Sequence, residues 1–236
     1  MSTHIHPIKL GVEYCYVVRG EGIILIDGGS PNQAMRFIKA MDTLELDPRD
    51  IDLIVMTHGH WDHIGSARAI QEITGAKIAM HHREKDWLEK ALRPLPPAVT
   101  TWGKILKTTM RVFLPLVHFP PAKVDVVLGD EELSLVDYGI PGRVLYTPGH
   151  SLGSVSVLLD TGDAFVGDLA MSGFPLRLSP GLPIFAEDIH KAKGSWRLLL
   201  ASGAKTVYPA HGKPFPAEIM RLALTTDGAA DPNGRQ

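Results

Sequence analysis

The sequence predicts an α/β protein in which helices lie outside two packed β-sheets. Short β-rich runs alternate with amphipathic helical segments in the first third of the chain, and the same order returns in the last third. The 236 residues are 44% apolar and 21% charged, which is ordinary for a chain that buries a sizeable core. Because sheets and helices cover their apolar faces with one another, this alternation favours helices packed on sheets.

In the first third, strands are expected at residues 12–18 and 22–27, separated by a turn. Residues 31–44 begin with proline and repeat apolar residues at helical spacing, as Phe37 and Met41 show. A buried strand over 51–56, a helix over 64–75 ending at Gly75 and a strand over 76–80 follow.

The last third repeats this order. Strands are expected at 143–147, 154–160, 163–168 and 205–210, with a helix at 187–203. Residues 1–215 are therefore interpreted as one domain and residues 216–236 as a C-terminal tail, of which the polar end over 225–236 is expected to fray.

The middle of the chain differs from both ends. Residues 94–121 are interpreted as an inserted, lid-like segment, because prolines surround one amphipathic stretch at 99–113. Its apolar stripe predicts a helix that packs on the domain or a dimer partner, covers a pocket, or lies on a membrane surface. The stripe consists of Val99, Trp102, Leu106, Met110 and Phe113.

Charge and cysteine content narrow the expected partners. The net charge of −2 gives no electrostatic reason to expect nucleic acid or an anionic membrane. The single cysteine, Cys15, excludes an intrachain disulfide framework. With no signal peptide or membrane-spanning run, the sequence favours a cytoplasmic enzyme that acts on a small molecule, with a homodimer left open.

Four metal-ligating side chains follow the predicted strand over 51–56. His58, His60, Asp62 and His63 form an H-x-H-x-D-H pattern, and a chance occurrence has odds of roughly one in a thousand. Imidazole and carboxylate together suit Zn²⁺, with Fe and Mn²⁺ as alternatives.

Three distant residues complete the set of possible ligands. His150, Asp168 and His211 each follow a strand-like run and each lie beside a glycine, which lets the backbone turn sharply. Seven ligands at strand ends predict a hydrolytic site for two divalent metal ions, with a carboxylate bridging them.

The order of these motifs over about residues 10–215 resembles the metallo-β-lactamase-fold superfamily. The resemblance implies a four-layer αββα sandwich with metals at the sheet edges. It also implies that one ion is held by His58, His60 and His150, the other by Asp62, His63 and His211, and that Asp168 bridges them. Asp27 matches an early aspartate that orients a ligand or loop, although it could equally be a turn former before Gly28.

Three subfamilies of this superfamily differ from the chain in a ligand, in length or in one residue near the site. A true β-lactamase is disfavoured because Asp168 takes the bridging position and Cys15 lies far away. The 25 residues after His211 are too few for the helical extension of glyoxalase II-like thioesterases. Lactonases match in size and ligands but carry a tyrosine where this chain has Met171.

The expected function is metal-dependent hydrolysis of a small ester, lactone or thioester by a metal-activated hydroxide. Two cations lower the pKa of a shared water towards about 7, and Asp62 or Asp168 accepts a proton. The alternatives are a mononuclear iron dioxygenase similar to persulfide dioxygenases, a minor β-lactam-hydrolysing activity, and a metal-binding protein without activity.

The substrate pocket is expected between the middle segment and residues 171–186, which are mainly apolar. Together they could form a wall for an acyl chain, or they could be ordinary packed loops. The candidate pocket residues are Trp102, Leu106, Met110, Phe113, Met171, Phe174 and Arg177.

Overall fold

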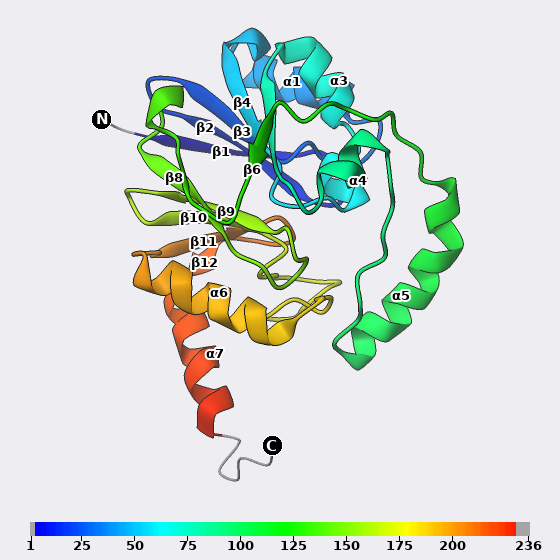
Figure 1. The fold of residues 1–236 in the computed structure, drawn as a ribbon, viewed down its shortest axis with the longest axis vertical. Coiled ribbons are helices and arrows are strands. Elements are labelled where there is room, and N and C mark those ends of the chain that lie inside the picture. The colour runs from blue at the N-terminus through cyan, green and yellow to red at the C-terminus, as the bar shows by residue number, and fades with distance from the viewer. Residues whose placement is uncertain (1–2, 230–236) are drawn as a thin grey trace.

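The computed structural model describes residues 3–229 and has four layers, with two sheets between two layers of helices (Figure 1). The first sheet has the order β1-β2-β3-β4-β5-β6, and the second the order β12-β11-β10-β9-β8-β7. The strands are β1 (His4–Lys9), β2 (Tyr14–Arg19), β3 (Ile23–Ile26), β4 (Ile51–Val55), β5 (Lys77–His81), β6 (Val126–Leu128), β7 (Leu133–Ser134), β8 (Gly142–Tyr146), β9 (Val155–Leu159), β10 (Asp163–Gly167), β11 (Thr206–Pro209) and β12 (Phe215–Pro216). The helices are α1 (Ala34–Thr43), α2 (Trp61–Ile64), α3 (Ala67–Thr74), α4 (Lys85–Glu89), α5 (Thr101–Phe113), α6 (Ile189–Ala201) and α7 (Glu218–Ala229).

The central strands of the first sheet, β2 to β5, bury both of their faces, whereas the edge strands β1 and β6 are partly exposed. In β2, Cys15 and Val17 belong to the outer core, whereas Tyr16 and Val18 belong to the core between the sheets. This division follows from the period of two along a strand, which sends successive side chains to opposite faces. A strand that is covered on both sides reads as a continuous apolar run, as "YCYVV" does.

Helices close the two outer faces of the sandwich. On the first sheet, α1 contributes Phe37 and Met41 and α3 contributes Ile70, all completely buried. On the second sheet, α6 contributes Trp196 and Leu199, and Met220 comes from α7. The αββα arrangement expected from the sequence is therefore confirmed, and its apolar layers hold the sheet edges in place.

Two pairs of parallel strands direct the chain to one edge of the sandwich. Strand β3 runs parallel to β4, and β10 runs parallel to β11. Because the carboxyl ends of parallel neighbours lie at the same edge, the segments after these four strands meet there. The two sheets are joined at this edge, where the Val155 amide donates a hydrogen bond to the Thr57 carbonyl over 2.8 Å.

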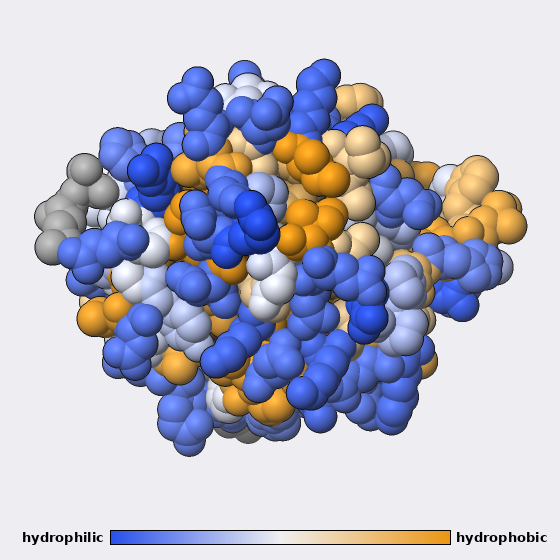
Figure 2. Space-filling view, turned by 90° about the horizontal axis from the view of Figure 1, so that it is seen from above, coloured by the Kyte–Doolittle hydropathy of each residue, from blue (hydrophilic) through white to orange (hydrophobic). Residues whose placement is uncertain are grey.

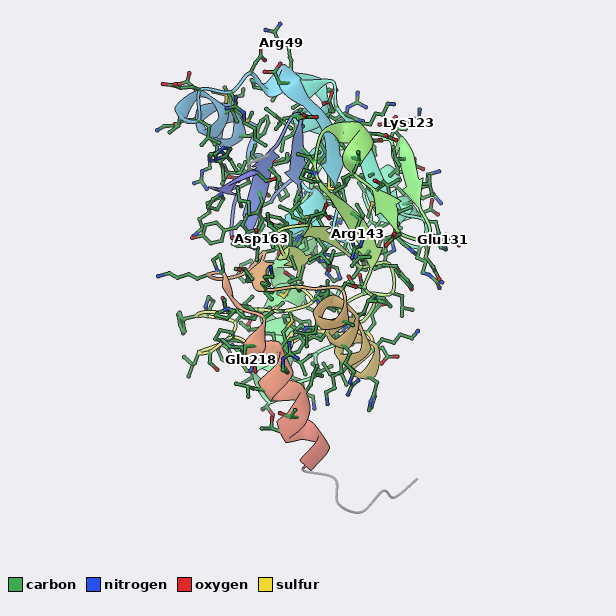
Figure 3. The ribbon with its side chains drawn as sticks, turned by 90° about the vertical axis from the view of Figure 1, so that its left-hand side faces the viewer. Arg49, Lys123, Glu131, Arg143, Asp163 and Glu218 are labelled. Atoms are coloured by element: carbon green, nitrogen blue, oxygen red, sulfur yellow. The ribbon has the colours of Figure 1, made fainter. Side chains whose placement is uncertain are left out.

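The structure corrects three of the expected elements. The helix expected over 64–75 begins only at Ala67, as α3, and Ile64 instead ends the separate short helix α2, which carries Asp62 and His63. The tail expected over 216–236 contains α7, which packs Met220 into the core and extends from the molecule beyond Glu218 (Figure 3). Strand β1, which was not expected, pairs with β2 along its whole length. Residues 230–236 lie outside the described chain.

Helix α5 forms within the proline-bounded segment and lies to one side of the sandwich (Figure 1). Thr100 caps its start by accepting a hydrogen bond from the Gly103 amide. Seen from the top of that view, apolar side chains reach the molecular edge on the side of α5 (Figure 2). Among residues 3–229, no helix has the length and apolar character that crossing a bilayer requires.

Candidate metal centre

Four loops at the shared sheet edge carry the seven predicted ligands. The loop after β4 and the short helix α2 supply His58, His60, Asp62 and His63. The loop after β8 supplies His150, and the segments after β10 and β11 supply Asp168 and His211. Residues that are about 150 positions apart in sequence therefore meet at one place, as parallel strand ends require.

The seven side chains form three overlapping groups, in each of which the ligand atoms lie within 4.8 Å of one another. The groups are His58–His60–His150, His58–His63–Asp168 and Asp62–His63–His211. The first and third groups correspond to the two ion sites that the resemblance implies, and the middle group joins them.

Asp168 lies between the two outer groups and turns one oxygen to each. Its Oδ1 is 3.4 Å from Nε2 of His63 and 3.4 Å from Nε2 of His211. Its Oδ2 is 3.7 Å from Nε2 of His150. A carboxylate shared in this way is the usual bridge of a two-metal site.

The orientation of the histidines leaves buried atoms without partners. His58 Nδ1 donates to the Thr57 hydroxyl (3.1 Å), which donates to Asp27, and His63 Nδ1 donates to Asp27 over 2.9 Å. These bonds occupy Nδ1 and leave Nε2 of His58 and His63 buried without a hydrogen-bond partner, along with Oδ1 of Asp168. Buried polar atoms are normally satisfied, so three such atoms facing one another fit a site for divalent cations.

Asp27 is thus the residue that connects two of the histidines. Its carboxylate accepts hydrogen bonds from the Thr57 amide over 2.7 Å, from the Thr57 hydroxyl and from His63 Nδ1. Asp27 lies immediately after β3. Its φ of 64° also makes it a turn residue before Gly28, so both sequence interpretations describe the same position. His150 is fixed similarly, because its Nδ1 donates to the Phe185 carbonyl over 2.8 Å.

A family comparison agrees with this geometry. A sequence model described as the metallo-beta-lactamase superfamily matches residues 8–211, a span that contains all seven of these side chains. The chain belongs to the metallo-beta-lactamase superfamily.

Relatives within the superfamily include metallo-hydrolases. The metallo-beta-lactamase fold-containing protein ST1585 of Sulfurisphaera tokodaii is 33% identical, with 93% of this chain and 82% of the relative covered. The crystal structure of ST1585 matches with a TM-score of 0.67 at 25% identity, covering 100% of this chain and 90% of that one. The probable metallo-hydrolase YqgX of Bacillus subtilis is 27% identical (72% and 70% covered). Hydroxyacylglutathione hydrolase GloC of Haemophilus influenzae is 24% identical (73% and 74% covered).

The superfamily's divalent-metal chemistry requires neutral imidazoles and charged carboxylates. Burial favours the neutral imidazole, whereas the neighbouring histidines outweigh burial at Asp62 and Asp168 and keep both carboxylates charged. Burial lowers the pKa of His58, His60 and His150, reaching about 3 for His60. Neutral imidazole is the form that ligates metals. Burial alone would also lower the pKa of His211, but Asp168 and Asp62 outweigh it and raise this pKa to about 9. A bound cation would replace that proton beside the same carboxylates.

Glu84 holds two ligand loops together, and sequence reasoning missed it. Its side chain is 1% exposed, and its two oxygens accept the amide of Gly59 over 2.6 Å and the amide of Gly153 over 2.7 Å. Gly59 separates His58 from His60, and Gly153 lies three residues after His150. The role of Glu84 depends on its burial between the amides of Gly59 and Gly153. These two glycines lie far apart in the sequence, so no local pattern indicates that they meet at Glu84.

The glycine at position 59 is required by its close neighbours, of which the Trp87 ring is the nearest. A Cβ there would lie 2.7 Å from Trp87 Cε3 and 2.9 Å from Met80 Cε, closer than carbon atoms pack, and it would crowd Glu84 Oε2 at 3.2 Å. The glycine of the H-x-H motif therefore admits the Glu84 carboxylate to the backbone.

A cavity of about 490 Å³ opens beside the ligands. Four predicted pocket residues line it: Leu106, Met110, Met171 and Phe174. Eight further lining residues were not among the candidate residues, namely Lys9, Gly11, Val12, Trp61, Pro96, Pro175, Leu176 and Phe185. A pocket that is mainly apolar with a few polar groups at one end is typical of small-molecule sites.

Three predicted pocket residues do not line this cavity. The Trp102 indole faces the 171–186 loop, where Nε1 donates to the Pro175 carbonyl over 2.8 Å, and Phe113 is 59% exposed. Arg177 donates to the carbonyls of Ser179 and Leu182 and so fixes its own loop. The stripe on α5 is wider than the cavity, so only Leu106 and Met110 reach it.

Proposed function

We propose that this chain is a hydrolase with two divalent metal ions, most suitably Zn²⁺, that cleaves a small ester, lactone or thioester. The observation that carries the proposal is Asp168, whose two oxygens face different histidine groups at 3.4 and 3.7 Å. Membership of a superfamily that includes metallo-hydrolases supports the reaction class. Zinc ligation by imidazole and carboxylate supports the choice of metal, with Fe and Mn²⁺ as alternatives.

In this proposal, His58, His60 and His150 hold one ion, Asp62, His63 and His211 hold the other, and Asp168 bridges them. When bound, the ions would polarise the scissile carbonyl and lower the pKa of water towards about 7. Asp27 keeps His63 Nε2 directed into the site, and the Phe185 carbonyl does the same for His150.

Asp62 is the chain's best-placed proton acceptor. It lines the cavity and is partly exposed, whereas Asp168 is 6% exposed and is surrounded by three histidines. The pKa of Asp62 is lowered, since His211 and His63 outweigh the effect of burial, so the group is a carboxylate at neutral pH. It could therefore take a proton at the edge of the cavity and release it to solvent.

The cavity wall supports an apolar acyl group on the substrate. Leu106 and Met110 from α5 pack with Met171, Ile184 and Phe185 in one apolar cluster beside the ligands. An acyl chain that covers this cluster would remove apolar surface from water at about 25 cal/mol per Å².

The test is metal-dependent hydrolysis of paired substrates. Protein purified without added metal is analysed for metal, stripped with a chelator, and assayed with butyryl thioesters, butyrate esters and lactones. Turnover that disappears on stripping and returns with zinc or manganese supports the proposal. Fully loaded protein that leaves all three classes intact contradicts it, and activity restored by iron alone would favour oxidation instead.

Metal stoichiometry tests the bridge separately. Mass spectrometry under native conditions is expected to show about two ions per chain at saturation. A ceiling of one ion at saturating metal would refute the bridging role of Asp168.

A further inference from the structure

A second cavity, of about 470 Å³, adjoins the metal-site cavity and has a different chemical character. The two cavities share Lys9, Val12 and Phe174, which therefore form the boundary between them. Gly212 and Lys213, which directly follow the ligand His211, line the second cavity. The second cavity therefore lies directly beside the metal-site cavity.

Two lysines and no carboxylate line this second cavity. Lys9 comes from the end of β1 and Lys213 from the loop after β11. The Lys9 ammonium lies 5.8 Å from the centre of the Tyr14 ring, which also lines the cavity. Within residues 3–229, neither lysine forms a salt bridge, so both charges are available.

The position of Lys213 is fixed by the backbone around it. Gly212 has a φ of +114°, and a Cβ there would lie 1.3 Å from the Ser172 carbonyl oxygen. The Ser172 hydroxyl donates to the Lys213 carbonyl over 2.6 Å, and the Ser172 amide donates to the His211 carbonyl over 2.8 Å. The segment that carries Lys213 is therefore tied to the segment after Asp168 on both sides of Gly212.

We propose that the second cavity is a subsite for an anionic group, a carboxylate or phosphate, on the leaving alcohol or thiol of the substrate. This inference rests on the proposed function and names its substrate class more closely. The acyl portion covers the apolar cluster at α5, and the leaving group extends past Lys9 and Phe174 to Lys213. Ammonium groups are suited to both anions as compact, mobile charges.

The subsite is tested with ligands that cannot be hydrolysed. S-butyl-3-mercaptopropionate and its amide, S-butyl-3-mercaptopropanamide, differ in charge but almost not in shape. Calorimetric titration of the metal-loaded protein is expected to show roughly five- to tenfold tighter binding of the carboxylate, because two partly exposed ion pairs form. The preference should shrink as salt is raised.

Lysine variants decide what holds the anion. Lys9→Met and Lys213→Met keep much of the apolar stem and remove the charge, so each should reduce the preference and the double variant should abolish it. Lys39→Met, at an exposed position on α1, is the matched control and should keep the full preference. Equal binding of acid and amide by the parent overturns the proposal. A preference that survives in the double variant also overturns it, since the metals would then bind the carboxylate.

A phosphate arm and a turnover arm complete the experiment. S-butyl-2-mercaptoethyl phosphate, titrated beside the carboxylate, shows which anion the two lysines bind more tightly. The corresponding butyryl thioesters are then assayed for thiol release. If the protein binds the anionic ligand in preference to the amide through its lysines but hydrolyses no thioester, the proposed function is wrong and the subsite stands. If it hydrolyses the thioesters but shows no such binding preference, only the subsite is wrong.

Discussion

The metal centre and helix α5 border the same cavity but are built in opposite ways. Five of the seven ligand residues are at most 6% exposed, and the protein fixes their orientation through Asp27, Thr57, Glu84 and the Phe185 carbonyl. In α5, by contrast, only Gly103 is buried among 13 residues. The centre is preorganised by the protein itself, whereas α5 has a large surface with few attachments.

This difference separates two kinds of function in the molecule. The start of α5 is attached through the hydrogen bond from the Val99 amide to the Ile184 carbonyl and through Trp102 to Pro175. Changes to the centre should therefore alter metal retention and turnover, whereas changes to α5 should alter the choice of substrate. The following variants test that separation.

Replacing Asp168 should have the largest effect. Asp168→Ala removes the carboxylate between the two histidine groups, so metal content should fall and turnover should drop by more than about 100-fold. The melt should remain cooperative because the surrounding apolar core is unchanged. Metal analysis, kcat and thermal denaturation measure this, with Asp160→Ala at an exposed position as the control. Full metal content with full turnover would show that the centre is assigned to the wrong residues.

Removing one acceptor at Glu84 should have a smaller effect on the same centre. In Glu84→Gln, the side-chain NH₂ must face one of the two glycine amides, which leaves a buried donor unpaired at about 1–3 kcal/mol. Metal affinity should weaken by roughly tenfold while KM for loaded enzyme changes little. Cobalt-loaded protein would show an altered visible spectrum, which a loss of stability alone would not produce. Glu131→Gln, on the surface, is the matched control (Figure 3), and unchanged cobalt affinity and spectrum in Glu84→Gln would argue against the clamp.

On α5, two positions on one helix should behave differently. Leu106→Ala removes a side chain that lines the cavity, so KM for butyryl substrates should rise roughly three- to tenfold with kcat and metal content retained. Phe113→Ala changes a side chain that is 59% exposed and does not line the cavity, so KM should stay the same. Steady-state kinetics over a series of acyl lengths measures both. Equal effects from the two variants would mean that α5 acts only through stability.

The last test concerns the pH dependence of stability, which reports on folding and not on turnover or substrate choice. Burial raises the pKa of Glu84 to about 7 from 4.5, so the folded chain binds this proton more tightly than the unfolded chain. The resulting stabilisation is complete below about pH 4.5 and is lost as pH rises through about 7, at roughly 1.4 kcal/mol per pH unit within that window. Denaturant unfolding of the parent and Glu84→Gln at pH 5 and pH 7.5 measures it. A parent-minus-variant difference that grows with pH would contradict the sign.

Local patterns predicted the strands and the superfamily, because both depend on short-range signals. The apolar runs around β2, β3 and β4 reflect burial on both faces, and the H-x-H-x-D-H spacing lies within six residues. The distant candidates, His150, Asp168 and His211, could be selected because each follows a strand beside a glycine. The structure brings all three to the same edge as the histidine motif.

Features that depend on tertiary contacts could not be predicted in this way. Glu84 resembles any helix-boundary glutamate until the fold places it between Gly59 and Gly153. Lys9 belongs to β1, a strand whose own apolar signal is weak and which is specified by pairing with β2. The stripe on α5 predicted a covered face correctly only at Leu106 and Met110, because periodicity shows which side chains share a face and not how much of it is covered.

The separation of the ligands along the chain gives the centre a part in folding. An ion shared by the histidine motif and His211 would close a loop of about 150 residues, and the entropic cost of such a closure grows only with the logarithm of its length. The chain loses this entropy when the two sheets dock, because the ligands come together only once β4, β8, β10 and β11 are in their native positions. Metal would then bind late in folding, after the transition state. Bound metal would therefore lower the unfolding rate more than it raises the folding rate.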